Sequence, residues 1–137
     1  MGGGPLRLLL DTHILVWWLI APARLSAAQT RALDLDRAVD ERLGVAATTL
    51  WEIAKLVEHR RLTFDDPIDL VLDGIERNPA LRILPLDARV ALESTRLGAR
   101  MSGDPADQLI VATARVHGLR LVTADERIRR SESVPVI

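Results

Sequence analysis

Residues 6–18, Leu-Arg-Leu-Leu-Leu-Asp-Thr-His-Ile-Leu-Val-Trp-Trp, place a short apolar run, one acidic residue and a longer apolar run in direct succession. Leu6–Leu10 has the length and composition of a buried β-strand. Thr12–Ile20 has the length of a helix, and Asp11 stands at the junction between the two. This order predicts a strand that passes directly into a helix, which is the opening half of a βαβ unit.

The same alternation continues along the chain. Further strands are expected at 45–47, 81–86, 119–123 and 134–137, and further helices at 26–43, 50–59, 67–77, 88–97, 105–117 and 126–130. Short strands separated by helices are typical of a parallel sheet that is covered on both faces. We therefore expect an α/β fold, a three-layer α/β/α domain with a parallel sheet of roughly five strands. Residues 6–137 are expected to form this single domain, and residues 1–5 a flexible leader or an expression remnant.

The composition excludes several classes of protein. The 137 residues contain no cysteine, which excludes disulfide frameworks, thiolate metal sites and cysteine nucleophiles. No apolar run approaches the ~20 residues that span a bilayer, so we expect no membrane association. Lys55 is the only lysine among 18 basic residues, a bias typical of GC-rich bacterial genomes, and we expect a cytoplasmic bacterial protein. The net charge of −1 means that any contact with nucleic acid needs a local group of arginines and a bound cation.

Four acidic residues fall where a predicted strand passes into a helix, namely Asp11, Glu52, Asp107 and Asp125. The carboxyl ends of parallel strands share one edge of the sheet, and ligands of open α/β sheets bind outside that edge. Each residue taken alone is better explained by a structural role, as a helix cap or, for Glu52, as a partner of Lys55. Thr49–Glu52 fits a capping box, and Asp104-Pro105 is typical of an N-cap followed by proline at the first helical position.

Taken together, the four residues favour a cation site. Asp107 shares a helical face with Ile110, Val111 and Ala114, so its carboxylate is expected to point inward. Converging carboxylates repel one another unless a cation neutralises them. Oxygen ligands without cysteine suit Mg²⁺ or Mn²⁺, and such sites hydrolyse phosphodiesters well.

Four segments resemble the motifs of PIN-domain ribonucleases of the VapC type, the toxins of VapBC toxin–antitoxin systems. They are Leu-Leu-Leu-Asp-Thr-His at 8–13, Leu-Trp-Glu-Ile-Ala at 50–54, Gly-Asp-Pro-Ala-Asp-Gln-Leu-Ile at 103–110 and Leu-Val-Thr-Ala-Asp at 121–125. They occur in the order of the family and together cover the chain from Leu6 onward.

The resemblance implies an endoribonuclease toxin that hydrolyses RNA phosphodiesters by metal-activated water. It implies Mg²⁺ or Mn²⁺ held by Asp11, Glu52, Asp107 and Asp125, with Asp104 as an accessory ligand or only the cap. It also implies a cognate VapB-type antitoxin that blocks the site, and a homodimer. Gln108 stands where many relatives carry arginine, which removes a positive charge beside the site.

Several other residues are assigned secondary roles. Thr12 and Thr123 flank acidic positions and are expected to hydrogen-bond a phosphate or to hold a carboxylate. The arginines near the predicted mobile loops 60–66 and 98–103 are expected to contact RNA phosphates, namely Arg60, Arg61, Arg96 and Arg100. Arg127, Arg129 and Arg130 are assigned either to such contacts or to the solvated surface. His13 is expected to be turned away from the site by the helix, and one of Trp17 and Trp18 to pack inside while the other lines a partner interface.

Two alternatives remain open at the level of the sequence. The first is a catalytically inactive PIN-fold module that binds nucleic acid or a partner, although all four acidic positions are filled. The second is a nuclease directed at DNA. A phosphatase of the haloacid dehalogenase type needs a second aspartate where His13 stands, and a phosphoacceptor receiver domain needs a late lysine that the chain lacks.

Overall fold

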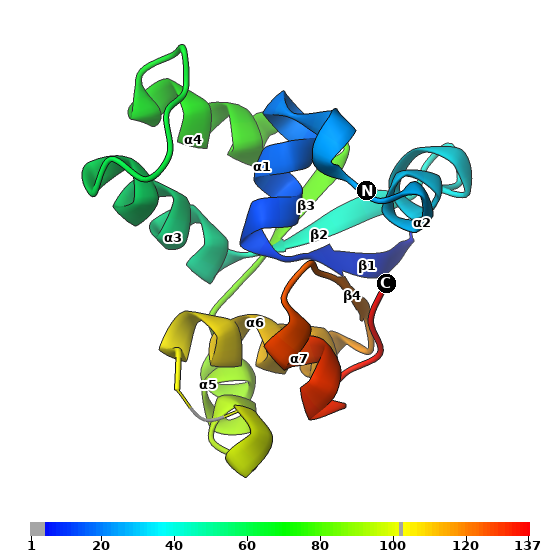
Figure 1. Ribbon diagram of the computed structural model, residues 1–137. Helices are drawn as coiled ribbons and strands as arrows, with labels where there is room; N and C mark the ends of the chain where they lie inside the picture. The colour runs from blue at the N-terminus through cyan, green and yellow to red at the C-terminus, as the bar shows by residue number, and fades with distance from the viewer. Residues whose placement is uncertain (1–4, 102) are drawn as a thin grey trace.

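The computed structural model describes residues 5–101 and 103–137. Within them, four strands form one parallel sheet in the order β3-β2-β1-β4 (Figure 1). The strands are β1 (Leu6–Leu10), β2 (Arg42–Ala46), β3 (Leu81–Leu84) and β4 (Arg120–Val122). Leu10 at the end of β1 is in register with Val45 of β2 and with Val122 of β4. The carboxyl ends of the three strands therefore lie level along one edge of the sheet.

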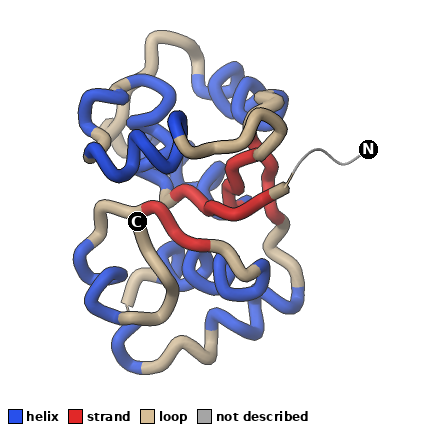
Figure 2. Tube along the Cα trace, turned by 90° about the vertical axis from the view of Figure 1, so that its right-hand side faces the viewer, coloured by secondary structure: helices blue, strands red, loops and turns tan. Residues whose placement is uncertain are grey.

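Helices cover both faces of the sheet. They are α1 (Thr12–Ile20), α2 (Ala27–Thr30), α3 (Ala47–Glu58), α4 (Ile68–Arg77), α5 (Ala88–Ser94), α6 (Pro105–His117) and α7 (Glu126–Ser131), with single-turn helices at Pro22–Arg24, Arg31–Leu35 and Ala99–Met101. Helices α1, α3 and α4 lie on one side of the strands and α5, α6 and α7 on the other (Figures 1 and 2). The expected three-layer α/β/α arrangement is confirmed.

Alternation along β1 explains why both faces are covered. Leu8 and Leu10 belong to the apolar cluster that includes α1, whereas Leu9 belongs to the cluster around α6. All three side chains are buried. Because successive side chains of a strand point to opposite faces, the run of three buried leucines at Leu8–Leu10 needs a helical layer on each side.

The last predicted strand, 134–137, is only partly formed. Val136 makes a single parallel bridge to Leu121, and the amide of Ile137 donates to the Leu121 carbonyl at 2.9 Å. The segment lies beside β4 as expected, but Pro135 has no amide hydrogen to continue the ladder. The described sheet therefore has four strands and an edge bridge rather than five strands.

The predicted helix over 26–43 is wrong. Helix α2 ends at Thr30, a π-turn runs on to Leu35, and β2 begins already at Arg42. The residues between them offer no apolar face, and Val39 is fully exposed. Leu43 is instead buried in the sheet, three residues before the end of β2.

Two smaller expectations also need correction or completion. Helix α3 begins at Ala47, so Thr49–Glu52 is not a capping box and Glu52 lies one full turn inside the helix. The predicted leader lies outside the described residues except for Pro5, which is exposed. Within the described residues, no helix is long and apolar enough to cross a membrane.

Candidate active site

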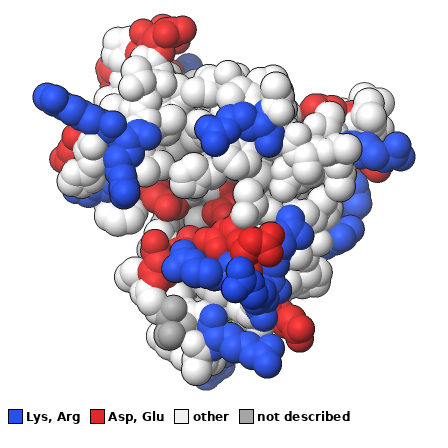
Figure 3. Space-filling view, viewed as in Figure 1, with Lys and Arg blue, Asp and Glu red and all other residues white. Residues whose placement is uncertain are grey.

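One pocket at the carboxyl edge of the sheet collects all the acidic residues that the sequence singles out. Its volume is about 270 Å³, and it is lined by Asp11, His13, Trp17, Glu52, Asp104, Asp107, Ala124, Asp125 and Arg127. These residues come from the ends of β1 and β4, from α1 and α3, and from the beginnings of α6 and α7. Figure 3 shows acidic side chains gathered near the middle of this face, with basic side chains beside them.

Asp11 is the most deeply placed carboxylate. Its residue is 8% exposed; Oδ1 accepts a hydrogen bond from the Thr12 amide at 2.9 Å, and Oδ2 accepts from the Thr123 hydroxyl at 2.6 Å. Burial raises the pKa of Asp11, while these two hydrogen bonds act in the opposite direction. Thr123 Oγ1 also accepts from the Asp125 amide at 3.0 Å. One buried hydroxyl therefore connects the ends of β1 and β4.

Thr12 plays the equivalent part for Glu52. Its hydroxyl donates to Glu52 Oε1 at 2.6 Å and lies 3.1 Å from the Thr49 hydroxyl. Burial raises the pKa of Glu52, and the charges of Asp11 and Asp104 add to that effect against the Thr12 hydrogen bond. Both threonines thus hold a carboxylate in this structure, which is one of the two roles expected of them.

Asp107 has a strongly raised pKa. It lies in the first turn of α6. Asp104 is the N-cap of this helix, as predicted, and its carboxylate accepts hydrogen bonds from the amides of Ala106 and Asp107. The Asp107 side chain is 13% exposed. Burial first, and then the charges of Asp104, Asp11, Asp125 and Glu52, raise its pKa to about 7. The carboxylates converge closely enough that one of them is poised to stay protonated near neutral pH.

Arg127 is the residue in this pocket that the sequence left undecided. Its Nη2 atom lies 3.0 Å from Asp107 Oδ2 and 3.2 Å from Asp125 Oδ2, while 68% of its side chain is exposed. Burial raises the pKa of Asp125, but the hydrogen bonds and charge of Arg127 outweigh it and leave that pKa below its ordinary value. Spacing along α7 gave no signal for this contact, because it depends on how α7 packs against α6.

The donor set has the chemistry of a hard cation site. All the candidate ligands are carboxylate oxygens, which suit Mg²⁺ or Mn²⁺. Among the described residues, however, no three acidic or histidine side chains are close enough together to hold one ion directly. Mg²⁺ commonly keeps several waters and takes only one or two carboxylates as direct ligands. Carboxylates spread around a pocket of this size therefore suit a hydrated cation, and Arg127 supplies the positive charge at Asp107 and Asp125 in the present arrangement.

Gln108 does not point into the pocket. Its Nε2 atom donates to the Met101 carbonyl at 2.7 Å and so fastens the turn at Ala99–Met101 to the start of α6. Arg100, in that turn, lines an adjoining hollow with Asp104, Asp107 and Arg127, and its guanidinium lies 3.8 Å from Glu132.

The remaining predicted residues are dispersed. Arg60 lines a separate hollow beyond α3, and Arg96 lines another beside α5. His13 lines the acidic pocket, so the expectation that the helix turns it away is wrong. Trp17 lines the pocket too and stacks on Arg24 at 4.7 Å, whereas Trp18 Nε1 donates to Asp34 at 3.0 Å. The indoles of Trp17 and Trp18 are both half-buried. The structure therefore does not place one of them in the core and the other at the surface, as expected from the sequence.

Comparison with known proteins places this pocket in a wider context. The family model described as PIN domain matches residues 8–132. Ribonuclease VapC22 of Mycobacterium tuberculosis is 40% identical over 121 residues, which are 88% of each chain.

Solved structures share the fold. VapBC2 from Rickettsia felis bound to a promoter DNA fragment matches with a TM-score of 0.70 at 18% identity, covering 95% of this chain and 96% of that one. DNA-bound VapBC from Salmonella typhimurium matches with a TM-score of 0.68 at 19% identity, covering 96% and 97%. FitAcB from Neisseria gonorrhoeae matches with a TM-score of 0.63 at 24% identity, covering 95% and 96%.

Proposed function

Because the chain belongs to the PIN-domain family, we propose that it is a divalent-metal-dependent endoribonuclease, acting as the toxin of a VapBC-type toxin–antitoxin pair. The single observation that carries this proposal is the convergence of Asp11, Glu52, Asp107 and Asp125, from four separate segments, on one pocket. A relative that shares 40% of its residues and is named a ribonuclease supports RNA as the substrate.

The four carboxylates are the proposed ligands of Mg²⁺ or Mn²⁺, with Asp104 acting mainly as the cap of α6. When bound, such an ion activates water and stabilises the charge that develops on the phosphate during hydrolysis. The protein's part is to hold the ligands in place. The Thr123 hydroxyl holds Asp11 Oδ2 and the Thr12 hydroxyl holds Glu52 Oε1, while Arg127 holds Asp107 Oδ2.

The ionisation of Asp107 depends on whether a cation is bound. Without one, its pKa of about 7 leaves it partly protonated near neutral pH. A cation in the pocket stabilises the ionised form and lowers that pKa. Substituting Asp107 therefore removes one ligand and also one of the mutually repelling negative charges that attract the ion.

The partners proposed for this chain follow from the same assignment. The matched structures include VapBC complexes, and we assign this chain a VapB-type antitoxin and a homodimeric state. Trp17 at the pocket rim and the 57% exposed Trp51 are apolar groups of the kind that interfaces bury. A toxin that acts on cellular RNA works in the bacterial cytoplasm, which is where we place it.

The test is cleavage of a panel of single-stranded and structured RNAs by antitoxin-free protein. Reactions contain Mg²⁺ or Mn²⁺, or EDTA, and compare wild type with Asp107→Asn; a matched single-stranded DNA panel separates an RNase from a DNase. We expect cleavage of RNA that both EDTA and the substitution abolish. RNA cleavage that survives Asp107→Asn in freshly purified protein contradicts the site, and cleavage confined to DNA contradicts the substrate.

A further inference from the structure

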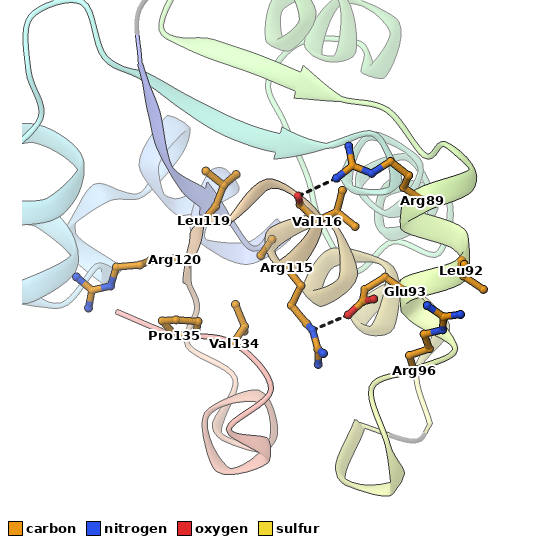
Figure 4. Close-up of a pocket in the computed structure, with 12 residues that line it drawn as sticks. Arg89, Leu92, Glu93, Arg96, Arg115, Val116, Leu119, Arg120, Val134 and Pro135 are labelled. Carbon is orange, nitrogen blue, oxygen red and sulfur yellow. Dashed lines mark hydrogen bonds and ion pairs between the residues drawn. The ribbon is translucent and has the colours of Figure 1, made fainter.

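A second and larger hollow lies at the far end of α6 from the acidic pocket. Its volume is about 690 Å³, and α5, the end of α6, the start of β4 and the C-terminal segment form its walls (Figure 4). We call it the arginine groove. Its lining includes Arg89, Arg96, Arg115, Arg120, Glu93, Leu92, Val134 and Pro135.

The groove is strongly basic in a chain whose net charge is −1. Its one acidic residue, Glu93, is paired with Arg115 at 2.8 Å, which leaves the charges of the other three arginines unbalanced. Within the described residues, the Arg96 side chain makes no hydrogen bond or ion pair, and only its backbone amide is bonded, to the Glu93 carbonyl. Figure 4 shows Arg96 and Arg115 on one side of the groove and Arg120 at its opposite rim, with the Arg120 guanidinium directed outward.

Two of these arginines are held in place without losing their binding capacity. Arg89 Nη2 lies 3.4 Å from the Val116 carbonyl, and Arg120 Nη2 lies 3.2 Å from the Val136 carbonyl. Each guanidinium has five N–H donors, so one backbone contact leaves most of them available. Both residues are exposed. Positioned guanidinium groups are the donors best suited to phosphate, which they bind in a bidentate manner.

We propose that the arginine groove binds the phosphate backbone of the RNA substrate away from the scissile bond. This inference rests on the proposed function. The acidic pocket repels phosphates, so RNA needs a source of binding energy elsewhere on the surface, and phosphate neutralisation by arginine is the usual one. The partly apolar lining from Leu92, Val134 and Pro135 offers contact area for sugars and bases between the phosphate contacts.

The geometry also sets the size of RNA that can use the groove together with the acidic pocket. Asp107 and Arg115 are eight residues apart on α6, which corresponds to about 12 Å along the helix. At ~3.4 Å per stacked nucleotide, an RNA that reaches both positions spans at least about four nucleotides. An RNA shorter than about four nucleotides therefore cannot contact both positions.

The test measures RNA binding without cleavage. Arg96→Gln and Arg120→Gln are combined in the Asp107→Asn background, and binding of a labelled RNA of 30 nucleotides is followed by fluorescence anisotropy at several salt concentrations. The matched control combines Arg31→Gln and Arg77→Gln, two exposed arginines outside the groove, in the same background. We expect Kd to rise about tenfold for the groove variant, and the slope of log Kd against log salt to fall by about 1.4, since each lost phosphate contact accounts for ~0.7 on a single strand.

Equal affinity and equal salt slope in the groove variant and the control overturn the proposal. So does a change in sedimentation mass of the groove variant, because it shows that the face is an interface between copies of the chain. Circular dichroism verifies folding, and Arg96→Gln alone, which breaks no internal contact, serves if the double variant unfolds. Wild-type cleavage is measured separately, so a protein that cuts RNA but binds it equally in both variants refutes the groove and leaves the proposed function standing.

Discussion

Asp107→Asn is expected to stabilise the metal-free protein at alkaline pH and to leave its stability unchanged at acidic pH. The pKa of Asp107 is about 7 in the folded protein and 3.8 when unperturbed. Between those values the folded protein binds the proton and the unfolded chain does not, so stability falls as the pH rises from about 4 to 7. Below that window wild type suffers no penalty, and above it the penalty is complete.

The magnitude follows from the size of the shift. Each pKa unit corresponds to 1.36 kcal/mol, so a displacement of about three units gives a limit of about 4 kcal/mol. Asparagine loses the ion pair between Asp107 and the exposed Arg127, which is worth ~0–1 kcal/mol. We therefore expect Asp107→Asn to raise the free energy of unfolding by about 2–4 kcal/mol at pH 8.

The assay is urea denaturation in EDTA at pH 4 and pH 8, with Asp65→Asn, an exposed position outside the pocket, as the matched control. The variant and wild type should converge at the lower pH and separate at the higher one, while the control tracks wild type throughout. Parallel curves for wild type and Asp107→Asn at both pH values, or a variant that is less stable at pH 8, refute the electrostatic reasoning about this pocket.

Three further predictions follow from single contacts. Arg127→Gln should raise the affinity for Mn²⁺ several-fold in calorimetry, because it removes the guanidinium charge that pairs with Asp107 and Asp125. Arg130→Gln, on the same helix, should leave the affinity unchanged. A lower affinity in Arg127→Gln contradicts this prediction. Thr123→Val should lower the free energy of unfolding by about 1–3 kcal/mol, because the Asp11 carboxylate and the Asp125 amide lose their partner. Thr95→Val, at an exposed helix end, should change it little. Equal stabilities of the two variants would argue against the role of the Thr123 hydroxyl. Gly44→Ala should lower the free energy of unfolding by about 1–3 kcal/mol, because the new Cβ would lie 3.1 Å from the Leu8 carbonyl oxygen. Gly74→Ala in α4, where a new Cβ would have no described neighbour within 4 Å, should raise it by ~0.5–1 kcal/mol. The opposite order in urea denaturation would show that β1 and β2 can move apart at little cost.

The acidic positions could be predicted because the information is local. Asp11 directly follows the apolar run Leu8–Leu10, and Asp125 lies three residues after Val122, the end of a second short apolar run. In a parallel sheet, that order alone brings both residues to the same edge. The capping roles of Asp11, Asp104 and Asp125 turned out to be real as well, so capping and membership of the pocket are not alternatives.

The remainder depended on packing between distant segments. Arg127 reaches Asp107 only because α7 folds back beside α6, and no spacing in the sequence reports that contact. Gln108 is turned away from the pocket by its bond to Met101, seven residues earlier in a loop. The boundary between the second helix and β2 was missed because Leu43, an apolar residue after a polar segment, fits the end of a helix as well as a strand, and only its burial in the sheet distinguishes the two.

The most direct test of the central claim is Mn²⁺-dependent cleavage of RNA by wild type and by Glu52→Gln. Glu52 lies on α3, in the helical layer opposite to α6, and it comes together with Asp107 at the pocket. We predict that wild type cuts RNA with Mn²⁺, that EDTA abolishes the activity, and that Glu52→Gln lowers it by at least a hundredfold while remaining folded. Cleavage by Glu52→Gln at the wild-type rate would contradict the claim that these four segments build one metal-dependent active site.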